Sequence, residues 1–134
     1  MKTWVSMYAI IWVALLEILL VLFPVFGFTL NVALHAVLGA VIFAFAFYIR
    51  RGVRRTACPD RIKRIATTTF GLAILQGVLG VLLFAAINYA WGTSYVTIIN
   101  FLHVINSIAI ITQASSSATA YDMWEEKEFQ SLPA

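Results

Sequence analysis

The chain has 134 residues, of which 62% are hydrophobic and 11% charged, and its formal net charge is +3. Soluble domains carry about 25% charged residues, so this composition excludes an ordinary soluble domain, and the length leaves room for a single domain. The sequence also lacks a nucleotide-binding fingerprint, a phosphate loop, zinc-ligand spacing and a hydrolase triad.

Four apolar stretches account for nearly the whole chain. They cover residues 4–23, 28–48, 66–87 and 95–118. A membrane span needs about 20 apolar residues, and a backbone in lipid must satisfy its own hydrogen bonds, so each stretch predicts a transmembrane helix. The first stretch is interpreted as a helix and not a signal peptide, because it is too long, contains Glu17 and lacks a cleavage site.

The connection 49–65 contains seven of the nine basic residues, which are Arg50, Arg51, Arg54, Arg55, Arg61, Lys63 and Arg64. Positive residues in short loops stay in the cytoplasm. The pattern therefore predicts a multi-pass protein of the cell membrane with this loop and both termini cytoplasmic. The loop is interpreted as a topology signal lying on lipid headgroups, with no nucleic-acid partner. Cys58 stands alone in it and forms no internal disulfide.

The polar tail 119–134 is expected to continue the last helix out of the membrane. The connections between the predicted helices are short, which favours an all-α, antiparallel up-down-up-down four-helix bundle. In that topology the second and fourth helices are diagonal and run in the same direction. His35 and His103, the two histidines of the chain, both lie roughly 10–12 Å below the outer membrane boundary, at about 1.5 Å per residue. They are expected to point to a common centre.

Few other polar side chains lie inside the predicted spans, and such residues usually face the interior. Asn100, His103 and Ser107 share a helix face, so this stripe is expected to point inward, and Asn106 lies nearby. Glu17 has a depth close to that of the histidines. It is interpreted either as a proton relay or acid/base group, or as a neutral hydrogen-bonding group paired with a donor such as Gln76.

The histidine pair has two interpretations. Haem fits because its iron takes two axial nitrogens, whereas zinc or copper would require three or four ligands. The alternative is that both imidazoles bond to neighbouring amides and hydroxyls and hold the helices together. Gly39, one turn after His35, and Gly80, four residues after Gln76, either face a flat ligand or permit close helix packing.

Three segments carry a resemblance to a known family. They read LHAVLGAVI in the second helix, ILQGVLGVL in the third and LHVINSIAI in the fourth. These resemble the histidine-containing and Leu-Gln-x-x-Leu-Gly helices of the haem A synthase (CtaA-like) family, over most of residues 28–115. Typical members fuse two four-helix halves. The chain resembles one half, which implies a compact, archaeal-type variant that functions as a homodimer.

The resemblance implies that one b-type haem is held by His35 and His103 as the metal ligands. It also implies that the methyl group of haem O is oxidised to the formyl group of haem A. Gln76, Gly77 and Gly80 match the third-helix signature, so they are expected to lie near the porphyrin.

The chain departs from the family pattern at two places. The family has a glutamate three residues before the second-helix histidine, where this chain has Val32, and the paired outer-loop cysteines are missing. Glu17 is therefore the candidate catalytic carboxylate.

Two alternatives to haem O oxidation remain open. A small bis-histidine cytochrome b subunit would transfer electrons within a respiratory membrane complex, with a quinone or another redox partner. A haem-free structural membrane subunit would only stabilise larger partners.

Overall fold

The computed structural model describes residues 3–23 and 25–130, and it is helical throughout apart from short connections. Its helices are α1 (Thr3–Leu22), α2 (Phe28–Val53), α3 (Asp60–Asn88) and α4 (Thr93–Gln130). All four are long and apolar enough to cross a membrane. The predicted all-α membrane fold is therefore confirmed.

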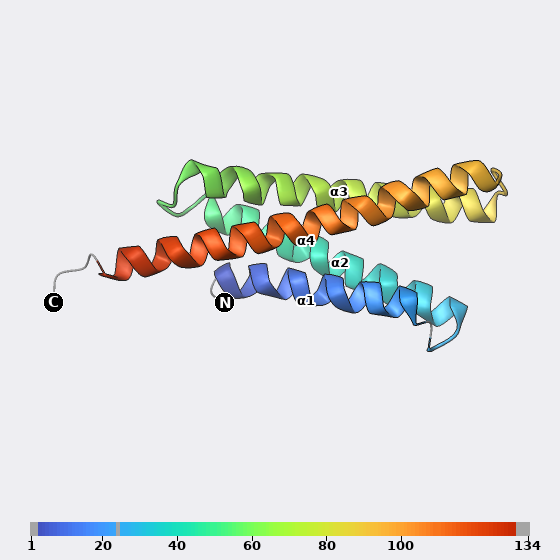
Figure 1. Ribbon diagram of the computed structural model, residues 1–134, viewed down its shortest axis with the longest axis horizontal. Helices are drawn as coiled ribbons and strands as arrows, with labels where there is room; N and C mark the ends of the chain where they lie inside the picture. Colours follow the sequence, from blue (N-terminus) through green and yellow to red (C-terminus); the bar gives the residue numbers. More distant parts are fainter. Residues whose placement is uncertain (1–2, 24, 131–134) are drawn as a thin grey trace.

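The four helices form an antiparallel bundle in which each packs against its two neighbours (Figure 1). Helix α1 packs against α2 and α4, and α3 packs against α2 and α4. The described residues of the diagonal pairs α1–α3 and α2–α4 make no close backbone approach. Short connections dictate this order, because each helix must turn back beside the one before it.

The end of the bundle at the α2–α3 connection is called here the basic end, and the opposite end the far end. The first residues of α1 and the last of α4 also lie at the basic end (Figure 1). Helix α4 continues to Gln130, which confirms the predicted extension of the last helix. Pro24 in the first far-end connection and residues 131–134 of the predicted tail lie outside the described residues.

The predicted connection 49–65 is mostly helical. Helix α2 runs on to Val53 and α3 begins at Asp60, which leaves six residues, 54–59, between them. Hydropathy marks where the apolar stretch ends, but arginine and lysine are good helix formers, so the helices continue beyond it. Pro59 precedes α3, and Asp60 lies in its first turn, where a carboxylate interacts favourably with the helix dipole.

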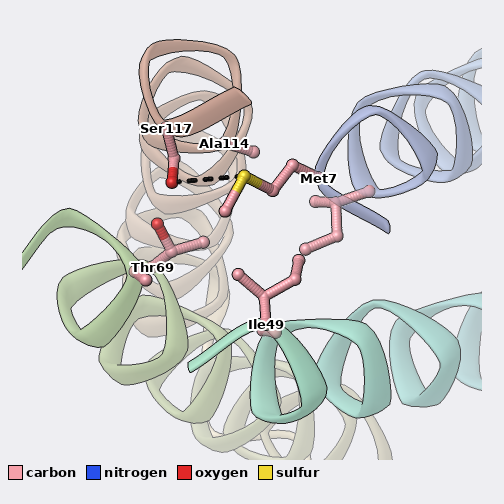
Figure 2. Close-up of a pocket in the computed structure, with 8 residues that line it drawn as sticks. Met7, Ile49, Thr69, Ala114 and Ser117 are labelled. Atoms are coloured by element: carbon pink, nitrogen blue, oxygen red, sulfur yellow. Dashed lines mark hydrogen bonds between the residues drawn. The ribbon is translucent and has the colours of Figure 1, made fainter. Parts of the chain in front are cut away.

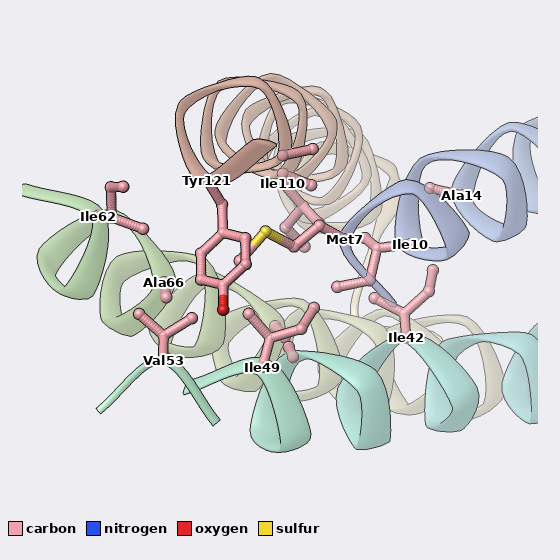
Figure 3. Packing of buried hydrophobic residues seen from close by; sticks show 14 of the residues in the cluster. Met7, Ile10, Ala14, Ile42, Ile49, Val53, Ile62, Ala66, Ile110 and Tyr121 are labelled. Carbon is pink, nitrogen blue, oxygen red and sulfur yellow. The ribbon is translucent and has the colours of Figure 1, made fainter. Parts of the chain in front are cut away.

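The apolar core lies in the half of the bundle nearer the basic end (Figure 3). Met7 and Ile10 from α1 meet Ile49 from α2 and Ala114 and Ala118 from α4, all of them buried. Small residues let helix backbones approach closely in lipid, where burial of apolar surface drives little association. The core is therefore held mainly by close packing.

One small cavity remains in this core, between Met7, Ile49, Thr69 and Ser117 (Figure 2). The Ser117 hydroxyl donates to the Met7 sulfur at 3.6 Å across it. The cavity measures about 10 Å³, which is room for no more than about one water molecule. The core of the basic half is thus tightly packed.

The far half of the bundle is much more open. Beyond the level of the histidines, the buried residues in the described part are Asn31, Leu79 and Ala86. The α1–α2 and α3–α4 hairpins diverge toward their connections in Figure 1. The histidines therefore lie where the closed core ends and the hairpins begin to separate.

A matched pair of alanines on α2 tests where the core lies. Ala46 is buried in the core and Ala44 is exposed on the same helix. We expect Ala46→Leu to lower the free energy of unfolding by about 1–3 kcal/mol because the core has no room for the added carbons. Ala44→Leu should leave it nearly unchanged. Denaturation of both variants in detergent measures the difference, and equal effects would contradict this packing.

Candidate functional site

The structure brings the two histidines into contact across the bundle. The imidazole rings of His35 on α2 and His103 on α4 have their centres 5.9 Å apart, with their planes at 61°. The backbones of α2 and α4 do not approach each other, so the long side chains span the gap. The sequence analysis expects this contact, because the two histidines lie at matching depths on diagonal helices.

His103 is held by a chain of hydrogen bonds between α3 and α4. Asn106 Nδ2 donates to the Leu72 carbonyl at 2.9 Å and to Gln76 Oε1 at 2.7 Å. Gln76 Nε2 lies 3.1 Å from His103 Nε2. An amide nitrogen can only donate, so His103 Nε2 is the acceptor. The chain leaves Nδ1 as the free nitrogen of His103.

His35 faces a carboxylate on the neighbouring helix. Glu17 Oε1 lies 3.5 Å from His35 Nδ1, but the two atoms do not form a hydrogen bond. Glu17 is 9% exposed, so this carboxyl group is packed inside the bundle. The expected pairing of Glu17 with Gln76 is not found, because the Gln76 amide is bonded to His103 and Asn106 instead.

Two of the three candidate glycines make room for these polar side chains. A Cβ atom at Gly39 would lie 3.2 Å from Glu17 Oε1, and one at Gly80 would lie 3.4 Å from His103 Cε1. Gly77 is exposed and a Cβ there would meet nothing within 4 Å. Contact of these glycines with a porphyrin remains a prediction. At Gly39 and Gly80, the neighbouring side chains of Glu17 and His103 account for the absence of a larger residue.

The predicted polar stripe on α4 is rotated from its expected position. Asn100 is exposed, and the Ser107 hydroxyl donates to the Val104 carbonyl of its own helix at 2.7 Å. Asn106, three residues after His103, is the buried residue that faces the site. Asn100 and Asn106 each lie three residues from His103, one before it and one after it. The spacing alone therefore does not tell which of the two faces the site.

Five side chains form one polar layer across the bundle, and every helix contributes to it. The polar layer consists of Glu17, His35, Gln76, His103 and Asn106. The His35 Nδ1 and His103 Nδ1 atoms are buried and have no hydrogen-bond partner in the described part of the chain. Buried polar atoms are normally paired, so each ring has a nitrogen whose bonding is incomplete. On His103 this nitrogen carries the ring proton, because Nε2 is the acceptor of the Gln76 amide.

Two facing imidazoles are the candidate ligand pair of the polar layer. A metal–imidazole nitrogen bond is about 2 Å, so two ligands on opposite sides place their nitrogens about 4 Å apart and their ring centres farther. The ring separation of 5.9 Å permits such a pair, and it is also an ordinary distance between two packed rings. Among residues 3–23 and 25–130, no group of three or more acidic, histidine or cysteine side chains could hold a metal alone. Haem iron needs only the two axial ligands.

No protein-family model, curated protein or solved structure matches the chain. The likeness to the haem A synthase family therefore rests on the three helix motifs alone. The assignment of the site must come from its geometry.

Asn106 offers a test of the polar layer. Asn106→Leu removes two bonds that join α4 to α3, and each such bond in a membrane is worth about 0.6–1.7 kcal/mol. We expect the unfolding free energy to fall by roughly 1–3 kcal/mol. Asn100→Leu, on the same helix and exposed, should change it little. Detergent denaturation of both variants is the measurement, and a smaller loss for Asn106→Leu than for Asn100→Leu contradicts the network.

Proposed function

We propose that this chain is an integral membrane protein that binds one b-type haem between His35 and His103. The observation that supports this is the pair of imidazoles on diagonal helices, whose ring centres lie 5.9 Å apart. We also place the basic end of the bundle on the cytoplasmic side of the cell membrane, because positive residues concentrate there.

The other members of the polar layer would orient the two ligands. Imidazoles that bind metals usually have their second ring nitrogen held by a carboxylate or another polar group, which fixes the ring and its proton. Gln76 fixes the His103 ring in a different way, by donating to its Nε2, which leaves the ring proton on Nδ1. Glu17 lies beside Nδ1 of His35, so the nitrogen of His35 that would bind the iron is Nε2. We therefore assign Gln76 and Glu17 as positioning residues for the two histidines.

We propose haem O oxidation, the reaction implied by the family resemblance, as the activity, carried out by the half-size chain as a homodimer. A bound haem supplies the redox chemistry, while the protein supplies binding, orientation and electrostatics. The missing glutamate at Val32 weakens the resemblance in sequence. In space, however, the Glu17 carboxyl group reaches the second-helix histidine from α1. It is placed to hold or exchange a proton at His35 Nδ1.

Electron transfer is the second candidate. Imidazoles that face each other across the bundle suit an iron with both axial positions filled, which carries electrons and leaves no open position for oxygen. The chain would then be a small cytochrome b subunit of a respiratory complex, with a quinone or another carrier as redox partner.

Substitution of either histidine tests haem binding. We expect purified wild-type protein to show a sharp b-type band when reduced, and His35→Ala and His103→Ala to lose it, because each removes one axial ligand. Asn100→Ala, one turn from His103 and exposed, is the control and should keep the full spectrum. An unchanged spectrum in either histidine variant would refute the ligand assignment, and a colourless wild-type protein would favour the haem-free structural subunit.

Co-expression with a haem O producer separates the two redox functions. A synthase should yield haem A in the extracted pigment, and Glu17→Gln should retain haem while losing that product. If wild-type protein binds haem but yields no haem A, electron transfer is the better assignment. If Glu17→Gln produces haem A at the wild-type rate, Glu17 has only a structural role.

A further inference from the structure

A polar groove lies between α3 and α4 near the basic end, remote from the histidines. It has a volume of about 480 Å³. The residues that line it are Arg61, Arg64, Ile65, Thr68, Gln113 and Ser116. Two guanidinium groups, two hydroxyl groups and one amide therefore face one space, and no carboxylate lines it.

This set of side chains suits a phosphate group. The guanidinium group of arginine is planar, always charged and able to donate two parallel hydrogen bonds to phosphate oxygens. Hydroxyl and amide groups add neutral donors beside it. A groove lined by donors and without an acidic side chain repels cations and attracts anions.

The neighbouring charges leave the two arginines of the groove available. Lys63 pairs with Asp60 at 3.4 Å, and the Arg50 guanidinium lies over the Phe70 ring, 5.1 Å from its centre. Within residues 3–23 and 25–130, Arg61 and Arg64 form no ion pair.

The acidic residues of α4 lie away from the groove. They begin at Asp122, six residues after Ser116, or about 9 Å along the helix. The positive charge of the groove is therefore not neutralised by its own helices.

The groove lies where the apolar stretches of α3 and α4 end, which is the level expected for lipid headgroups. Arg61 and Arg64 directly precede the apolar stretch of α3, and Gln113 and Ser116 lie near the end of the apolar stretch of α4. Basic pockets between transmembrane helices at this level bind anionic headgroups. We propose that this groove binds the phosphate of one anionic phospholipid, independently of the site between the histidines.

The experiment compares two pairs of arginines. The full-length protein in neutral detergent is titrated with phosphatidylglycerol or phosphatidylcholine, and bound lipid is counted by native mass spectrometry. We expect a clear preference for phosphatidylglycerol. Arg61→Gln with Arg64→Gln should weaken its binding by about thirty-fold, the usual contribution of two basic residues at an anionic surface. Arg54→Gln with Arg55→Gln removes the same charge from the exposed α2–α3 connection and should leave binding nearly unchanged.

One further variant and one soluble competitor distinguish specific lipid binding from general attraction of charge. Arg64→Lys preserves the charge but not the planar donor pair, so it should bind with intermediate affinity, and circular dichroism confirms that every variant is folded. Glycerol phosphate at the same concentrations should not compete, because a lipid also requires the adjoining apolar surface. Equal losses in the two arginine pairs, equal binding of the two lipids, or full competition by glycerol phosphate would overturn the proposal.

Discussion

Hydrocarbon offers no hydrogen-bond partner, and this constraint organises the middle of the bundle. Polar side chains within the spans gain most by meeting one another, and here they gather in one layer that every helix enters. Asn106 and Gln76 bind α4 to α3 through hydrogen bonds, while Glu17 Oε1 on α1 lies 3.5 Å from His35 Nδ1 on α2 without a hydrogen bond between them. The contact between the imidazoles then joins the two hairpins.

The two halves of the bundle have different packing, and the polar layer lies at their boundary. Toward the basic end, Ala46, Ala114 and Ala118 allow close approach of helices around Met7 and Ile10. Toward the far end, buried residues become sparse and the hairpins separate. The tightly packed core of the basic half fixes the relative positions of all four helices. It thereby holds the two histidines in place from the side of the basic end. Access to the imidazoles is easier from the open half, since their surroundings there are less tightly packed.

Length and hydropathy sufficed to predict the four helices, their antiparallel order and the approach of His35 to His103. They did not predict how each helix is rotated, because a helix surrounded by lipid is apolar on its outer face as well as its inner one. For that reason the sequence predicts Asn100 inside the bundle, whereas the structure buries Asn106 there. It also suggests Gln76 as a partner of Glu17, whereas Gln76 bonds to His103. Hydropathy indicates which residues contact lipid, and it does not indicate where a helix ends. The sequence therefore does not predict that α2 continues to Val53, beyond its apolar stretch.

Two ring nitrogens of the polar layer are buried without a hydrogen-bond partner among the described residues. A layer that served only to hold helices together would be expected to satisfy its buried donors and acceptors, since each unpaired one costs about 1–3 kcal/mol. Gln76 and Asn106 meet that expectation, yet His35 Nδ1 and His103 Nδ1 do not. Outside the layer, Ser6 Oγ, Arg50 Nε and the side-chain amide of Asn31 are also buried without a partner. The unsatisfied atoms thus include a nitrogen on each of the two facing rings, so the hydrogen bonding of the polar layer is incomplete within the described residues.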